Sequence, residues 1–87
     1  MQSDLVVPKQ MRKVEYLVGD NIWRECEFNQ LRTGDKFRMF EEDGTPVRSG
    51  SIFVAMSNPK MIGNVSMVEI RIDGTQKLTH LAYRVLH

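Results

Sequence analysis

The fold class is indicated most clearly by residues 31–47, which read LRTGDKFRMFEEDGTPV. The dipeptides Gly-Asp at 34–35 and Asp-Gly at 43–44 are typical of tight turns. Between these turns, the apolar residues Phe37 and Met39 alternate with Lys36, Arg38 and Phe40. A period of two places alternate side chains on opposite faces of a strand. The stretch therefore predicts a turn, a strand with Phe37 and Met39 in the core, and a second turn.

The rest of the chain repeats this pattern, with turn signals every 8–12 residues or so, a spacing typical of a β-sandwich or barrel. The predicted strands cover residues 11–18, 22–28, 36–40, 46–47, 52–56, 65–72 and 77–86. Residues 52–56 are apolar on both faces, which predicts the central, most buried strand. Residues 57–64 are expected to form a loop, and residues 29–33 to form the one short helical turn.

These patterns predict an all-β protein, with a small five- to seven-stranded antiparallel barrel or SH3-like roll. Residues 1–10 are expected to be a flexible N-terminal segment, and residues 11–87 a single β-barrel-like domain. A chain of 87 residues has a thin core. Short β-domains often bury additional surface by association, so a homo-oligomer is one expected state.

Composition excludes several classes of function. The formal net charge is +1, which gives no overall electrostatic reason to bind nucleic acid or a membrane. Cys26 is the only cysteine, so neither an intrachain disulfide nor a cysteine metal cluster is expected, and a reducing compartment is predicted. The longest apolar run, residues 52–56, is far shorter than the roughly 20 residues that span a bilayer. The prediction is a cytoplasmic protein without a membrane partner.

Catalysis is not predicted, and neither is a cofactor or a metal. The two histidines, His80 and His87, lie in no order typical of a nucleophilic triad. Cys26 shares its strand face with apolar residues, which favours inert packing. The acidic residues 41–43 lack the ligand spacing of a calcium-binding loop and are expected to form a solvated turn.

A ligand-binding role is predicted instead, for an anionic small molecule or a host protein. Arginine and lysine side chains neutralise an anion, aromatic rings stack on a planar group, and hydroxyl and amide groups give direction. The residues expected to supply these contacts are Trp23, Arg38, Phe40, Arg48, Ser57, Asn58 and Lys60. Trp23 fits two interpretations equally, as a core residue or as an interface residue.

Nucleic-acid binding is the alternative. Outward-facing cations beside an aromatic residue on a β-surface contact phosphates and stack bases. The residues expected to act in this way are Arg12, Lys13, Arg38, Arg71 and Arg84. Glutamates are interspersed among them, so a mixed-charge, soluble surface is the competing interpretation.

Residues 28–72 resemble small bacteriophage- and prophage-encoded proteins that have no assigned activity. The similarity rests on Leu31-x-x-Gly34-Asp35-x-Phe37-Arg38, on Asp43-Gly44-x-Pro46-Val47, and on Ala55-x-Ser57-Asn58-Pro59. The resemblance implies no catalytic residues. It implies a phage accessory or counter-defence protein that sequesters a host factor, either a nucleotide-type signal or a host protein. A structural component of the virion or of its assembly is the third class of function.

Overall fold

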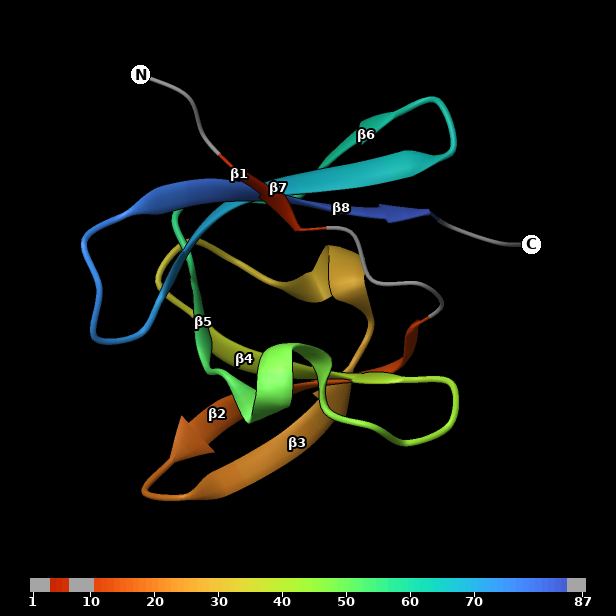
Figure 1. Cartoon of the computed structure of the whole chain (residues 1–87). Helices are drawn as coiled ribbons and strands as arrows, with labels where there is room; N and C mark the ends of the chain where they lie inside the picture. Colours follow the sequence, from red (N-terminus) through yellow and green to blue (C-terminus); the bar gives the residue numbers. More distant parts are fainter. Residues whose placement is uncertain (1–3, 7–10, 85–87) are drawn as a thin grey trace.

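The computed structural model describes residues 4–6 and 11–84, and their regular secondary structure is nearly all β-strand. The elements, in chain order, are β1 (Asp4–Val6), β2 (Met11–Gly19), β3 (Ile22–Cys26), the 3-10 helix η1 (Phe28–Gln30), β4 (Lys36–Glu41), the 3-10 turn η2 (Val47–Gly50), β5 (Phe53–Ala55), β6 (Lys60–Ile62), β7 (Val65–Ile72) and β8 (Leu78–Arg84). Figure 1 shows two layers: β6, β7 and β8 lie in one, β2, β3 and β4 lie in the other, and β5 connects them.

All strands belong to one sheet, in the order β1-β8-β7-β5-β4-β2-β3, with β6 beside β7. Every pairing is antiparallel except β1 with β8, which is parallel. The sheet curls around a single core, but within the described residues no strand pairing joins β3 to β1. The arrangement is therefore a half-closed barrel, in which one edge of β3 is unpaired among the described strands.

The core lies on the inner face of the curled sheet. Tyr16, Phe37, Phe53 and Ile72 stand in register across β2, β4, β5 and β7, so their side chains share this face. Phe37 and Phe53 are fully buried, and their ring centroids lie 5.6 Å apart. The alternation that places Phe37 inside places its neighbours on β4 outside.

The helix η1 lies between the two layers (Figure 1). The Gln30 side chain caps its first turn, because Oε1 accepts a hydrogen bond from the Glu27 amide at 2.9 Å. Phe28 is buried, and its ring centroid lies 5.1 Å from that of Tyr83 on β8. Ser66 on β7 donates its hydroxyl to Asn29 Oδ1 at 2.5 Å. These contacts connect η1, which follows β3, to the opposite layer that contains β7 and β8.

The structure confirms the all-β class, the buried strand at β5, the hairpin of β2 and β3 and the helical turn after β3. Phe37 and Met39 are core residues, as predicted.

Three local predictions differ from the structure. The expected extended stretch at residues 46–47 is present only at Pro46, which forms a β-bridge with Phe40, because Val47 begins η2, where Arg48 and Ser49 have positive φ. The expected loop at 57–64 contains β6, paired with β7. The predicted strand over residues 22–28 is too long, because β3 ends at Cys26 and Phe28 begins η1.

Within the expected N-terminal segment, the described residues 4–6 form β1, which alternation did not predict. The last residues of the predicted C-terminal strand, 85–87, lie outside the described part.

Candidate binding site

Three residues predicted to contact a ligand meet on the outer face of the sheet. The guanidinium carbon of Arg38 lies 4.2 Å from the centroid of the Trp23 ring and 5.6 Å from that of the Phe40 ring. Lys13 Nζ lies 4.8 Å from the Phe40 centroid. Strand register explains this grouping, because Lys13 pairs with Phe40 across β2 and β4. We call these four residues, Trp23, Arg38, Phe40 and Lys13, the aromatic–cation ladder.

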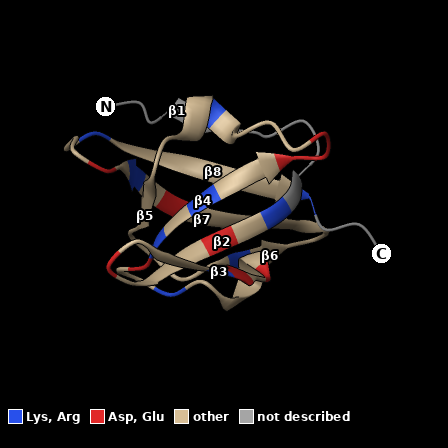
Figure 2. Cartoon of the chain, turned by 90° about the horizontal axis from the view of Figure 1, so that it is seen from below, with Lys and Arg blue, Asp and Glu red and all other residues tan. Residues whose placement is uncertain are grey.

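Glu15 forms ion pairs with both cations of the ladder. It stands opposite Arg38 in the strand register, and Arg38 Nε and Nη2 both lie 2.8 Å from Glu15 Oε1. Lys13 Nζ lies 3.3 Å from Glu15 Oε2. Burial alone would raise the pKa of Glu15, but the hydrogen bonds from Arg38 and Lys13 outweigh it and lower the pKa. Acidic and basic segments consequently lie side by side on β2 and β4 (Figure 2).

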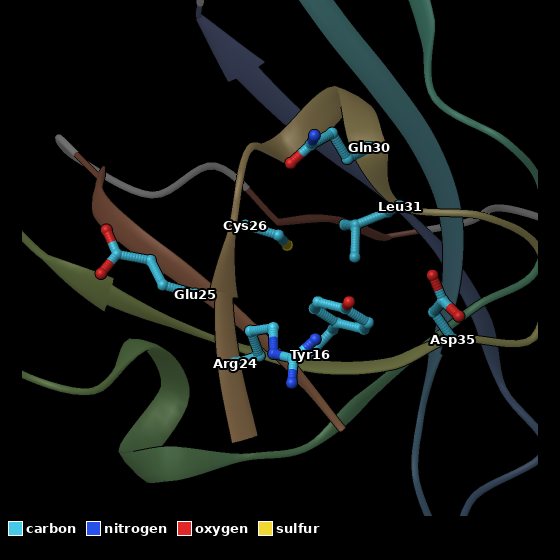
Figure 3. Close-up of a pocket in the computed structure, with 7 residues that line it drawn as sticks. All are labelled: Tyr16, Arg24, Glu25, Cys26, Gln30, Leu31 and Asp35. Atoms are coloured by element: carbon cyan, nitrogen blue, oxygen red, sulfur yellow. The ribbon is translucent and has the colours of Figure 1, made fainter. Parts of the chain in front are cut away.

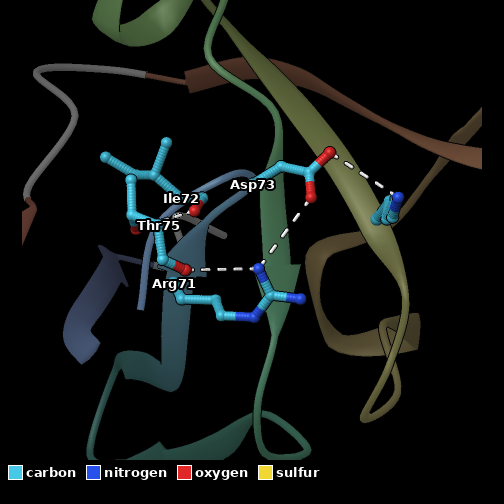
Figure 4. Close-up of polar contacts among 5 residues, drawn as sticks. Arg71, Ile72, Asp73 and Thr75 are labelled. Carbon is cyan, nitrogen blue, oxygen red and sulfur yellow. Dashed lines mark hydrogen bonds and ion pairs between the residues drawn. The ribbon is translucent and has the colours of Figure 1, made fainter. Parts of the chain in front are cut away.

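A second charged group on the same face surrounds Val54. Val54 is buried but does not belong to the core cluster, and the register places Lys36 on one side of it and Arg71 on the other. Asp73 lies 3.6 Å from Lys36 Nζ and 3.9 Å from Arg71 Nη1 (Figure 4). Arg71 also donates to the Thr75 carbonyl at 3.4 Å. Arg71 thus faces outward as predicted, but its charge is partly balanced at the turn.

Ser57, Asn58 and Lys60 lie elsewhere. They line a pocket of about 440 Å³ together with Ile62, Met67, Val68, Glu69 and His80. Ser57 Oγ accepts a hydrogen bond from the Glu69 amide at 3.0 Å. Asn58 Oδ1 accepts hydrogen bonds from the Thr33 amide at 2.8 Å and from the Thr33 hydroxyl at 3.1 Å. Ser57 and Asn58, which were expected to orient a ligand, therefore use these side-chain oxygens for hydrogen bonds to Glu69 and Thr33.

The remaining predicted residues do not join either group. Arg48 is an exposed residue of η2. Arg84 is exposed at the end of β8. The side chain of Arg12 lies outside the described part. The structure thus gathers Trp23, Arg38 and Phe40 with Lys13, and separates them from Arg48 and from the loop pocket.

A pocket on the other side of β3 was not predicted. It has a volume of about 340 Å³ and lies between β2, β3 and the segment that follows η1 (Figure 3). It is lined by Tyr16, Arg24, Glu25, Cys26, Gln30, Leu31 and Asp35. The sequence held one signal for it, since Arg24 interrupts an otherwise apolar strand face.

The thiol of Cys26 in this pocket is poorly ionised. Burial raises its pKa to about 11, and the carboxylates of Asp35, Glu27 and Glu25 contribute in the same direction. Since the thiolate is the nucleophile, this environment favours the inert packing role predicted for Cys26.

In the part of the chain that the structure describes, no group of three or more His, Cys, Asp or Glu side chains is placed to hold a metal ion. No helix among these residues has the length and apolar character needed to cross a membrane.

The fold and these surfaces define a small, mostly antiparallel β-protein with an ordered aromatic and charged outer face. Comparison with known proteins finds no match for the chain among protein-family models, curated proteins or solved structures. The resemblance of residues 28–72 to phage proteins remains a prediction.

Proposed function

We propose that this protein is a non-enzymatic binding module that sequesters a host protein through the outer face of β2, β3 and β4. The aromatic–cation ladder is the observation that carries the proposal. Tryptophan and arginine are enriched among residues that dominate the free energy of protein association. Here Arg38 is stacked on Trp23 and held by Glu15, so less side-chain freedom is lost when a partner binds.

The geometry favours a protein over a small anion. Small molecules bind in concave sites, whereas the ladder lies on the outer surface of a sheet. Arg38 and Lys13 already share the carboxylate of Glu15, which reduces their attraction for a phosphate. A protein partner supplies both charges and apolar area, and so matches a face of mixed charge with aromatic rings. The phage resemblance of residues 28–72 supports a partner that belongs to the host.

The test uses the full chain as bait in a bacterial lysate, followed by measurement with the purified captured protein. Four baits are compared: wild type, Trp23→Ala, Arg38→Ala and the control Arg84→Ala, which removes an exposed arginine outside the ladder. We expect wild type and Arg84→Ala to bind the purified partner equally. We expect Trp23→Ala and Arg38→Ala to bind it at least about tenfold more weakly, because each removes a central anchor.

Thermal melting of each bait confirms that it is folded. A partner that binds all four baits with the same affinity contradicts the proposal, as does the absence of any partner that binds after purification.

A nucleic-acid partner is the second candidate. It is favoured because four cationic side chains lie on one face of the sheet. Lys13, Lys36, Arg38 and Arg71 all project from the outer face, against the carboxylates of Glu15 and Asp73. The test is fluorescence anisotropy with a labelled single-stranded oligonucleotide over a range of salt concentrations. Binding through these cations must weaken as salt rises, with a slope set by the number of phosphates contacted. Absent or salt-independent binding excludes this candidate.

A further inference from the structure

The pocket beside β3 has a nonpolar floor and two opposite charges at its sides. Its floor is formed by the ring of Tyr16, by Leu31, which is almost fully buried, and by the uncharged thiol of Cys26 (Figure 3). Arg24 and Asp35 lie on different sides of Tyr16 in this view. The register agrees, because Arg24 pairs with Tyr16 from β3, whereas Asp35 immediately precedes β4 on the other side of β2.

Both charges are available to a ligand. Among the described residues, Arg24 has neither an ion pair nor a side-chain hydrogen bond, and it is exposed. Asp35 uses one carboxylate oxygen, Oδ2, to accept a hydrogen bond from the Arg32 amide at 2.9 Å. The other oxygen, Oδ1, has no partner in the described part of the chain. Glu25 also borders the pocket, but its carboxylate is directed away from the centre in Figure 3.

The pocket is accessible and of suitable size. Its volume of about 340 Å³ falls within the roughly 300–1,000 Å³ found for ligand pockets. It opens beside β3, which pairs only with β2 among the described strands, so no neighbouring strand covers the entrance. A ligand could enter without displacing any part of the sheet.

We propose that this pocket binds a small zwitterion with an aromatic or apolar body, such as a free amino acid. The cationic nitrogen of the ligand faces Asp35, its carboxylate faces Arg24, and its body lies on Tyr16 and Leu31. Burial of the ligand body against the apolar floor contributes to the free energy of binding. The two charged side chains orient the ligand and make the site selective for a zwitterion. This site is separate from the aromatic–cation ladder and does not depend on the function proposed for it.

The experiment titrates the ¹⁵N-labelled full chain with three probes that share one phenyl ring. L-phenylalanine carries both charges, phenethylamine only the cation, and 3-phenylpropionate only the anion. We expect L-phenylalanine to shift the amide signals of Tyr16, Cys26 and Asp35 saturably, and each single-charge probe to bind at least about tenfold more weakly. The reason is that one charge-assisted hydrogen bond is lost in each case.

Two variants test the assigned contacts. Arg24→Gln should weaken L-phenylalanine to the level of phenethylamine, and Asp35→Asn should weaken it to the level of 3-phenylpropionate. Asn at position 35 retains an oxygen for the Arg32 amide, so the turn is preserved. Arg84→Gln is the matched control and should leave binding unchanged.

The proposal is overturned if L-phenylalanine gives no saturable shift up to its solubility limit. It is also overturned if a single-charge probe binds as tightly, or if neither Arg24→Gln nor Asp35→Asn weakens binding.

Discussion

The inner and outer faces of β2, β3 and β4 carry similar aromatic residues in different roles. On the inner face, Phe37 is fully buried against Phe53 and contributes to the free energy of folding. On the outer face, Phe40 and Trp23 remain partly exposed and hold Arg38 between them. Only three positions separate Phe37 from Phe40 on one strand. A residue's contribution therefore depends on the face it occupies, and the outer aromatic residues are free to contribute to binding.

The largest expected effect is on stability, from Phe37→Ala. Replacing a fully buried phenylalanine by alanine costs about 3–5 kcal/mol, because apolar contacts are lost and a cavity remains. For a domain of this size, that is a large fraction of the total free energy of unfolding. Urea denaturation followed by circular dichroism measures it. Phe40→Ala is the matched control on the same strand, and its cost should be about 1 kcal/mol or less. Equal losses would refute the distinction between the two faces.

The next effect concerns the chemistry of the inner face at Cys26. Its pKa is raised from 9.0 to about 11, so the thiolate fraction at pH 8 falls about a hundredfold. We expect alkylation by iodoacetamide at pH 8 to be slower than for a solvated thiol by about that factor. Mass spectrometry of the folded chain, compared with the same chain in denaturant, gives the rates. Similar rates in both conditions would show that the inner environment does not suppress ionisation.

A smaller effect is expected at the contact between η1 and β7. Ser66→Ala removes the hydroxyl that donates to Asn29, at a cost of about 1 kcal/mol. A double-mutant cycle with Asn29→Ala isolates the pairwise term from other changes at either residue. Chemical denaturation of the four proteins measures it. Strictly additive losses would mean that this hydrogen bond does not stabilise the fold.

The smallest effect is expected on the outer face, from Glu15→Gln. The pKa of Glu15 in the folded protein is lowered below its usual value of 4.5, so the ionised form stabilises the fold. This contribution is present in full above pH 4.5 and is lost as pH falls through the lower, folded-state pKa. The wild type should exceed Glu15→Gln in stability by about 1 kcal/mol or less at pH 7. The difference should shrink below pH 4.5, and a constant difference at acid pH would contradict this origin.

Alternation in the sequence was sufficient to predict the strands that have one apolar face. It predicted β4 and its buried pair, Phe37 and Met39, because a period of two is unambiguous there. It did not predict β1 or β6. Each has three residues, too few to show a period. Each is a strand because of its partner: β1 pairs with β8, which is distant in sequence, and β6 pairs with β7 across a turn.

The candidate site was predictable only in part, for a related reason. Trp23, Arg38 and Phe40 were identifiable as aromatic and charged residues on strands, and their contact follows from register. The roles of Ser57 and Asn58 were not predictable, because their hydrogen-bond partners come from β7 and from the segment after η1. Arg24 and Asp35 border one pocket because β3 and the segment before β4 lie on opposite sides of Tyr16 in β2, a register that no local pattern encodes.

The position of η1 between the two layers has a consequence for the order of folding. The pairings of β2 with β3 and with β4 join residues that are closer in sequence. The hydroxyl that Asn29 accepts belongs to a residue 37 positions later, and Tyr83 is farther still. Contacts at such separation require long loops to close and therefore form slowly. During synthesis, η1 cannot make these contacts until β7 and β8 have left the ribosome, so a segment made early reaches its final packing late.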